Sequence, residues 1–427
     1  MALAHSHRMR HFYMCGGLRL APTHACDWRS LVIEVDMLEH GLLGLSGWQT
    51  LAYTLIVTHI TIVGVTVYLH RFSAHRALDM HPALQHFFRF WVWSTTAMLT
   101  KDWTAIHRKH HAKCETEEDP HSPVKKGLWT VLSRGAELYA EAKDPETLER
   151  YGKGTPDDWL ERKVYSRFPI GGVLFTLVLN MLLLGPMGIT VWAVQMMWMP
   201  IFAAGIINGL GHNTGYRNFD SPDASTNIVP WGFVIGGEEL HNNHHTYPNS
   251  AKLSVQPWEF DLGWFYISIF SKLGLVWNIR RGPVVHHNPG KENLDSDAAL
   301  AAANNRFQVM ASFNRKVLQA TVSAQLAHAD QQRRALLKRV GKLIGREIHT
   351  LKPKQQGQVN ALINQDAMMK TLMEFRQQLQ AVWQKRTANR EELYAALADW
   401  CKRAEESGIE VLNQFAKQMR SYSTVAA

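Results

Sequence analysis

Residues 47–75 read GWQTLAYTLIVTHITIVGVTVYLHRFSAH, and this stretch decides how the rest of the chain is interpreted. From Gly47 to Leu69 it contains no Asp, Glu, Lys or Arg. A helix rises about 1.5 Å per residue, so one of this length covers the hydrocarbon core of a bilayer, about 30 Å thick. We therefore expect a membrane-spanning helix that leads directly into His70 and His75.

Three further apolar segments follow along the chain. Residues 168–210 are broken by Gly-Pro-Met-Gly at 185–188, which predicts a transmembrane hairpin with helices of about 17 and 20 residues. Residues 82–100 contain His86 and Arg89 among aromatic and apolar residues. Residues 258–277 carry Glu259, Asp261 and Lys272, which is typical of an amphipathic segment in the membrane interface.

The overall composition conceals two unlike parts. The 427 residues carry 46 Lys and Arg, 37 Asp and Glu, 29 Gly, 16 Pro and 4 Cys, which excludes collagen-like and disulfide-stapled chains. Residues 291–427 hold 21 of the basic and 13 of the acidic residues, so residues 1–290, with 25 and 24, are nearly neutral. Residues 1–46 form an N-terminal tail without a secretory signal, and translation starting at Met37 is the alternative.

The C-terminal part has the pattern of a soluble helical extension. Apolar residues recur at helical spacing among Gln, Lys and Arg, and Pro353 ends the first run. Its positive charge suits a cytoplasmic face, an anionic lipid surface or an acidic redox partner. The apolar stripes are Leu336, Leu337, Val340, Leu343, Ile344 and Ile348, then Leu372, Phe375, Leu379 and Val382, then Leu393, Tyr394, Leu397 and Trp400.

Three histidine clusters carry the chemistry. Two of them have HxxHH spacing, which brings three imidazoles to one face of a helix, whereas an i, i+5 pair lies about 140° apart on an ideal helix and needs a bend at the helix end. Neutral imidazole binds iron, copper and zinc, and eight such ligands are too many for one ion, so we expect two metals. The clusters are His70 and His75, His107, His110 and His111, and His241, His244 and His245.

A further ligand is predicted at the end of the hairpin. His212 follows Asn208 by one helical turn, so both side chains can face the same side. If all clusters share one metal site, residues 82–100 cannot cross the membrane and are re-entrant or interfacial. The Lys and Arg residues of 101–167 and the basic tail predict that the metal site is on the cytoplasmic face.

The motifs resemble those of the membrane-bound fatty acid desaturases, above all the stearoyl-CoA (Δ9) group. Residues 107–121 read HRKHHAKCETEEDPH, residues 208–220 read NGLGHNTGYRNFD, and residues 238–248 read EELHNNHHTYP. The similarity extends over roughly 48–282 and leaves out the tail after Lys291. The family has four spanning helices; here Leu31–Ser46 includes acidic residues, so we expect three crossings.

The resemblance implies a di-iron centre held by the eight clustered histidines and His212, with Asn208 contacting one iron through water. The fold is then all-α: membrane helices with a cytosolic histidine-rich cap (47–290) and a helical extension (291–427). The implied reaction is O2-dependent insertion of a cis double bond, at Δ9, into a long-chain acyl substrate. The acyl chain would thread an apolar channel, which Trp103 either walls or merely packs beside. His59 is expected to be a packed residue.

Partners and alternatives follow from other features. Glu115, Glu118, Asp119, Glu238 and Glu239 are candidates to orient the rings, or are solvated charges. The sequence contains no HPGG haem motif and no CxxC, so we expect a separate ferredoxin- or rubredoxin-type electron donor with its reductase, in a bacterial inner membrane. No nucleic-acid partner is expected. The alternatives are a hydroxylase or ketolase on the same scaffold and a metal-binding or transport protein.

Overall fold

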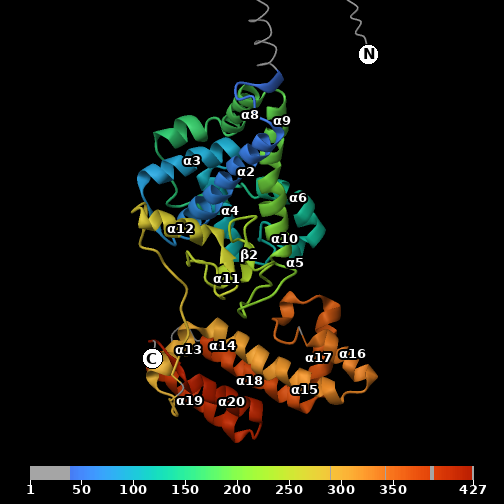
Figure 1. Ribbon diagram of the computed structural model, residues 1–427. Coiled ribbons are helices and arrows are strands. Elements are labelled where there is room, and N and C mark those ends of the chain that lie inside the picture. Colours follow the sequence, from blue (N-terminus) through green and yellow to red (C-terminus); the bar gives the residue numbers. More distant parts are fainter. Residues whose placement is uncertain (1–38, 289, 342, 385–388, 426–427) are drawn as a thin grey trace, which may run out of the picture.

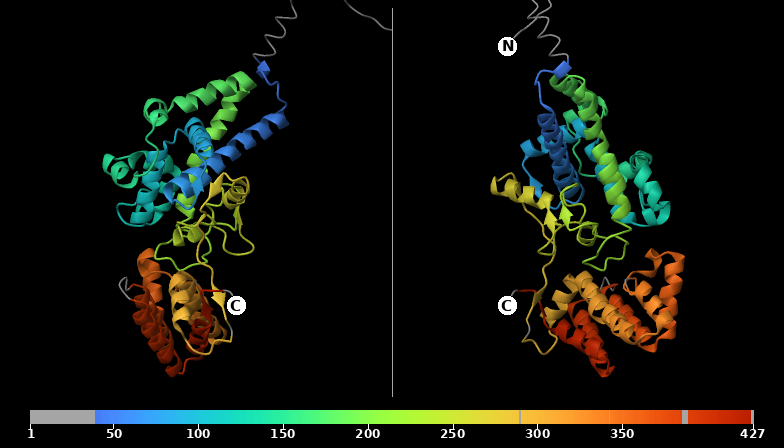
Figure 2. Two further views of the ribbon diagram at one scale, coloured as in Figure 1. Left: turned by 90° about the vertical axis from the view of Figure 1, so that its left-hand side faces the viewer. Right: turned by 45° about the vertical axis from the view of Figure 1, so that its right-hand side comes forward.

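The computed structural model describes residues 39–425 except 289, 342 and 385–388 (Figure 1). The expectations for the tail before residue 39, including a start at Met37 and the first half of Leu31–Ser46, lie outside the described residues. The described chain is mostly helical and forms two bodies, which are separate in both further views (Figure 2). One body contains the apolar helices and the histidines, and the other contains the C-terminal helices.

Within the described residues, two continuous helices are long and apolar enough to cross a membrane. The first, Gly47–Ala74, consists of α2 (Gly47–Val63) and η1 (Gly64–Ala74), and the second, Met187–Leu210, consists of α9 (Met187–Trp198), η3 (Met199–Ile207) and α10 (Asn208–Leu210). The shorter apolar helix α8 (Gly171–Leu184) packs against α9 and completes the predicted hairpin.

These helices direct many apolar side chains outward. Only 22% of the most apolar window of Met187–Leu210 is buried within the molecule. A soluble protein rarely exposes so large a contiguous apolar surface, so a lipid environment accounts for this one. Among the exposed residues are Leu51, Leu55 and Ile56 on α2, Leu174, Phe175, Val178 and Leu182 on α8, and Ile189, Val194, Met197 and Ile201 on α9 and η3.

The segment predicted to be re-entrant is the helix α3 (Pro82–Thr96), which packs against η1 and α8. Its 15 residues extend about 22 Å, less than the bilayer core. The chain turns at Ala97, which has a φ of 56°, and enters α4 (Thr100–Lys113). Arg89 on α3 is buried and makes two hydrogen bonds to Asp158 of the cap, at 2.5 and 2.6 Å.

The remaining elements form the cap and two short sheets. Strand β1 (Asp79–Met80) pairs antiparallel with β4 (Val276–Trp277), and β2 (Trp231–Gly232) pairs parallel with β3 (Phe260–Asp261). The predicted interfacial segment contains α12 (Leu262–Lys272). The cap helices are α5 (Pro123–Lys126), α6 (Leu128–Glu141), α7 (Pro145–Tyr151), η2 (Glu161–Tyr165) and α11 (His241–Thr246).

The C-terminal body is a helical bundle, and the central residues of each predicted apolar stripe form its core. Pro353 does not end the first run: the helix ends at Val340, and Pro353 begins the next helix, where its fixed φ and missing N–H suit the first turn. The helices are α13 (Ser296–Asn304), α14 (Arg306–Phe313), η4 (Asn314–Gln319), α15 (Ala320–His328), α16 (Gln331–Val340), η5 (Ile348–Thr350), α17 (Pro353–Gln365), α18 (Ala367–Gln384), α19 (Arg390–Glu406) and α20 (Glu410–Arg420).

Residues 278–285, which form neither helix nor strand, join the two bodies (Figure 1). Strand β5 (His286–His287) lies before residue 291, yet it pairs antiparallel with β6 (Tyr422–Ser423) at the end of the bundle. The bundle therefore takes in residues that precede the expected boundary.

Candidate metal centre

The predicted histidines converge from four separate elements. His70 comes from η1, His107, His110 and His111 from α4, His241, His244 and His245 from α11, and His212 from the turn after α10. His75 caps the end of η1. The HxxHH spacing places three imidazoles on one face of α4 and three on one face of α11, as the sequence predicts.

A π-helix aligns the i, i+5 pair. Residues 64–74 have π-helical hydrogen bonding, and the His75 amide donates to the His70 carbonyl at 3.1 Å. Hydrogen bonds of i→i+5 type place residues five apart one turn apart, so His70 and His75 share a face and their rings lie 4.8 Å apart. The sequence predicts that a bend at the end of an α-helix brings the two rings together. In the structure a π-helix, which is wider than an α-helix, does so instead.

The nine imidazoles separate into two groups. His70, His75, His107, His111 and His244 have ligand atoms within 4.8 Å of one another. The second group adjoins it: the His110 and His245 Nε2 atoms are 3.3 Å apart, and the His212 and His241 Nε2 atoms 3.1 Å apart. His241 and His245 have ring centroids 4.4 Å apart, which joins these two pairs.

The ring nitrogens have the arrangement of a metal site. Within the first group, Nε2 of His244 lies 3.0 Å from that of His70 and 2.8 Å from that of His111. Two nitrogens about 2.1 Å from one ion and at right angles are about 3.0 Å apart. Burial, and then the neighbouring imidazoles, lower the pKa of His107, His111 and His244 well below its ordinary value, which favours the neutral form that ligates metals.

Carboxylates hold the opposite nitrogen of four rings. Nδ1 of His70 lies 2.7 Å from Glu238, Nδ1 of His110 lies 2.9 Å from Asp119, and Nδ1 of His212 lies 3.2 Å from Glu115. Nδ1 of His245 lies 3.1 Å from Asp223. A carboxylate at Nδ1 fixes the proton there and leaves Nε2 free for a metal. These residues therefore fit a pair of transition-metal ions.

The predicted orienting residues divide into two sets. Glu115, Asp119 and Glu238 contact histidines, whereas Glu118 is exposed and pairs with Lys113. Glu239 accepts hydrogen bonds from the backbone amides of residues 234, 235 and 237 and so shapes the loop before α11. Asp223 is not among the residues predicted from the sequence, because nothing in its neighbouring residues indicates that the chain folds back onto His245.

Two further residues lie beside the second group. His121 stacks near His110, with ring centroids 4.3 Å apart, and its buried Nε2 has no hydrogen-bond partner within the described residues. Cys114 lies near His110, His212 and His245, and burial, followed by the nearby carboxylates, raises the pKa of its thiol well above the usual value. His59 instead makes a 2.7 Å contact with the Tyr266 hydroxyl, consistent with a packed residue.

An apolar cavity of about 270 Å³ leads to the histidines. Asn208 lines it together with His70, His107 and His241, whereas Lys143 lines it as a half-exposed cation. The remaining lining residues are mostly apolar and come from η1, α3, α4, α6, α9, η3 and neighbouring loops; they include Val65, Met98, Trp103, Ile106, Ala136, Met199, Pro200, Ala203, Ala204 and Ile207. Trp103 stacks on His107, with centroids 4.8 Å apart and planes at 10°, so it both walls the cavity and packs on a predicted ligand.

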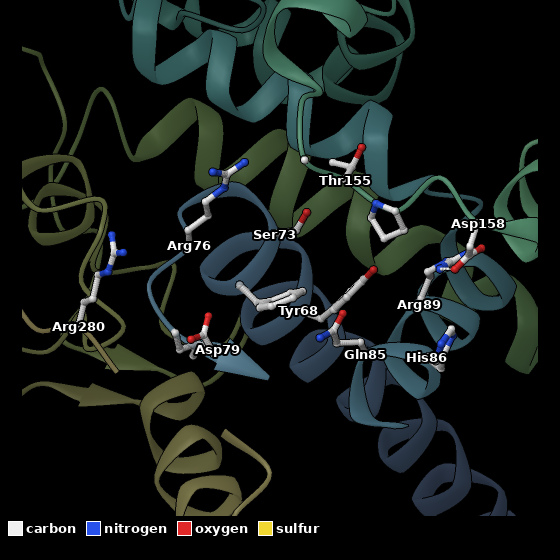
Figure 3. A pocket seen from close by; sticks show the side chains of 14 residues that line it. Tyr68, Ser73, Arg76, Asp79, Gln85, His86, Arg89, Thr155, Asp158 and Arg280 are labelled. Atoms are coloured by element: carbon white, nitrogen blue, oxygen red, sulfur yellow. Dashed lines mark hydrogen bonds and ion pairs between the residues drawn. The ribbon is translucent and has the colours of Figure 1, made fainter. Parts of the chain in front are cut away.

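A second, polar hollow of about 510 Å³ lies beside the segment that carries His70 and His75, but none of the nine histidines lines it. Figure 3 shows Arg89 against Asp158 on one side of it and Arg76 and Arg280 on the other. Its charged lining does not suit a hydrocarbon chain.

Comparison with known proteins agrees with this geometry. Residues 46–262, just over half of the chain, match the family model described as fatty acid desaturase. Residues 301–425 match a second family model, described as a transposase; they lie entirely within the C-terminal bundle.

Individual relatives are also similar over the first half. A Δ9 acyl-lipid desaturase of Arabidopsis thaliana is 28% identical, over 55% of this chain and 75% of its own length. An sn-1 stearoyl-lipid 9-desaturase of Synechocystis is 30% identical, over 55% and 73%. An acyl-CoA 5-desaturase of Anemone leveillei is 29% identical, over 53% and 70%. The chain belongs to the fatty acid desaturase family.

Proposed function

We propose that this membrane-associated oxidoreductase uses O2 and two iron ions to insert a cis double bond, at Δ9, into a long-chain acyl substrate. Family membership supports the fatty acyl substrate and the desaturation chemistry in general. The observation that carries the finer proposal is the apolar cavity whose lining includes members of both histidine groups.

The proposed ligands are the nine histidines, with Asn208 contacting one iron through water. The ligand atoms are the nitrogens of neutral imidazoles, which bind iron. The carboxylates contact the Nδ1 atoms of four histidines and do not lie where the Nε2 atoms meet. Bound there, iron supplies with O2 and two electrons the oxidising power that an unactivated methylene requires. The first group offers five nitrogens, and the second offers four, with the Cys114 sulfur close to three of them.

The cavity selects the carbon that reacts. Its apolar lining removes an acyl chain from water, and Trp103, stacked on His107, fixes the distance between the wall and the histidines. Position 9 stands in the names of the Arabidopsis thaliana and Synechocystis relatives, whereas the Anemone leveillei enzyme is named for position 5. The Δ9 position is therefore the finest part of the proposal.

The electron donor is proposed to be a separate protein of ferredoxin or rubredoxin type, acting with its reductase at the cytoplasmic face of a bacterial inner membrane. The apolar belt on α2, α8 and α9 supports membrane insertion. The charged cap and the basic bundle support a cytoplasmic orientation.

A hydroxylase on the same scaffold is the second candidate, because histidine clusters determine oxygen activation more strongly than its outcome. The specific observation in its favour is the half-exposed Lys143 in the cavity lining, which indicates that water can reach the chamber. A metal-binding or transport protein fits less well, since an apolar cavity beside the metal site has no role in it.

The test is expression in a host without this activity, followed by mass spectrometry of fatty acid methyl esters. A new monounsaturated ester supports the proposal, and hydroxylated or unchanged chains in cells whose purified protein carries iron refute it. His244→Ala removes a nitrogen that faces both His70 and His111 and should abolish the product. His328→Ala, on an exposed position of α15, is the matched control and should leave the product unchanged.

A further inference from the structure

A guanidinium of the C-terminal bundle is buried at the junction with the membrane domain. Arg376 on α18 is 3% exposed, and its Nη2 atom lies 2.7 Å from Oδ2 of Asp220, which belongs to the other body. The same nitrogen lies 3.1 Å from Glu347, and Nε donates to Asn314 at 3.1 Å. The bundle therefore presents Arg376 in a fixed orientation, held by its own polar residues.

Asp220 depends on this contact. Its side chain is 4% exposed, and the other cation within 4.0 Å is Arg217, at the limit of that distance. The Arg217 guanidinium is directed at the carbonyls of Phe219, Ser221 and residues 223 and 225 rather than at the carboxylate. A buried carboxylate that loses its close partner is strongly destabilising, so removal of Arg376 should force residues near Asp220 to move.

Those residues support the second histidine group directly. Asp223 Oδ2 contacts Nδ1 of His245 at 3.1 Å. The backbone amide of Ala224 donates to Glu115 at 2.7 Å, through the same oxygen that contacts His212. Residues 218 and 219 donate their amides to Asn242, which lies on α11 next to His241. One short segment, residues 217–225, thus links Asp220 to three predicted ligands.

We propose that the C-terminal bundle is a positioning element of the metal centre, and that Arg376 acts through Asp220 to hold residues 217–225 against the second histidine group. This inference rests on the metal site of the proposed function. Two other contacts also join the bundle to the domain that carries the histidines. The Asp220 amide donates to the Phe307 carbonyl at 3.3 Å, and the rings of Phe307 and Tyr247 are 6.0 Å apart. Both views in Figure 2 show the bundle beneath the end of the domain that carries the 210–260 segment.

The experiment uses the full-length protein in detergent micelles. Iron per chain and the rate of iron loss to a chelator are measured for the wild type, Arg376→Gln, Asp223→Asn and a control, Arg403→Gln. Arg403 lies on α19 with its side chain 44% exposed and pairs with Asp399 within the bundle. Far-ultraviolet circular dichroism reports whether the helices remain folded.

The expected result is graded. Asp223→Asn should weaken metal binding about 10- to 100-fold, because it removes a direct partner of a ligand. Arg376→Gln should speed iron loss several-fold from one of the two sites while the helical signal is retained, and Arg403→Gln should match the wild type. The double variant Asp220→Asn/Arg376→Gln should lose iron more slowly than Arg376→Gln alone, since it leaves no charged carboxylate buried at position 220.

Two outcomes overturn the inference: Arg376→Gln keeps both ions at the wild-type rate, or the double variant is no better than the single one. If the wild type itself binds no iron, the proposed metal centre fails instead. The two failures are therefore distinguishable.

Discussion

Replacing Asp119 by asparagine tests how the carboxylates control the metal site. Asp119 is fully buried and accepts three hydrogen bonds: from Nδ1 of His110 at 2.9 Å, from the His121 amide at 3.1 Å and from the Glu115 amide at 2.7 Å. Burial alone would raise its pKa, but His110, His121 and the Glu115 amide keep that pKa below its ordinary value. The residue is therefore a carboxylate in the folded protein.

The size of the effect follows from these three bonds. Asparagine keeps the shape but offers one acceptor oxygen, so its NH2 group must face at least one of the three N–H donors. An unsatisfied buried donor costs about 1–3 kcal/mol. That cost lowers the free energy of unfolding with or without iron. Iron binding weakens because His110 loses the carboxylate that fixes its proton at Nδ1, and the loss typical of such partners is about 10- to 100-fold.

The assay is a competition between the purified protein and an Fe²⁺ chelator of known affinity, with metal content measured by mass spectrometry. Glu118→Gln is the matched control, because Glu118 is adjacent in sequence but 59% exposed and paired with Lys113. Asp119→Asn with wild-type affinity, or Glu118→Gln with an equal loss, would refute the reasoning that buried carboxylates at Nδ1 tune this site.

Three other predictions concern the cavity and its surroundings. Trp103→Ala removes the ring stacked on His107, so the double bond should appear at a broader set of positions, as gas chromatography of the products will show; an unchanged single product contradicts this. Gly135→Ala places a Cβ 2.5 Å from the Ala204 carbonyl oxygen, so α6 must move away from η3, and the thermal unfolding temperature should fall by several degrees; an unchanged temperature contradicts this. Cys114, whose thiol pKa is raised by burial and then by nearby carboxylates, should resist alkylation at pH 8 until the protein is denatured, and rapid labelling of the folded protein would count against the structure.

The features that depend on local spacing could be read from the sequence. The HxxHH clusters needed only the helical period to bring three imidazoles together, and the apolar runs at 47–69 and 168–210 gave the long helices and the hairpin. Leu337, Val340, Leu379 and Trp400 are core residues of the bundle, because an apolar stripe of helical period must be buried.

The features that depend on tertiary contacts or on unusual hydrogen bonding could not be read in this way. The π-helix before His75 has no simple residue signature, so a bend was expected in its place. Asp223 reaches His245 because residues 217–225 fold against α11, and Arg376 meets Asp220 across 156 positions of sequence. Pro353 lies at a helix boundary both in the prediction and in the structure. A single proline, however, does not reveal whether a helix ends before it or begins with it.

The proposed metal centre is tested most directly by the iron content and the Mössbauer spectrum of the purified full-length protein. We expect two iron ions per chain in two distinct environments, one richer in nitrogen ligands than the other, and neither with carboxylate ligands. A single ion per chain, or two ions bound by carboxylate oxygens, would contradict this expectation.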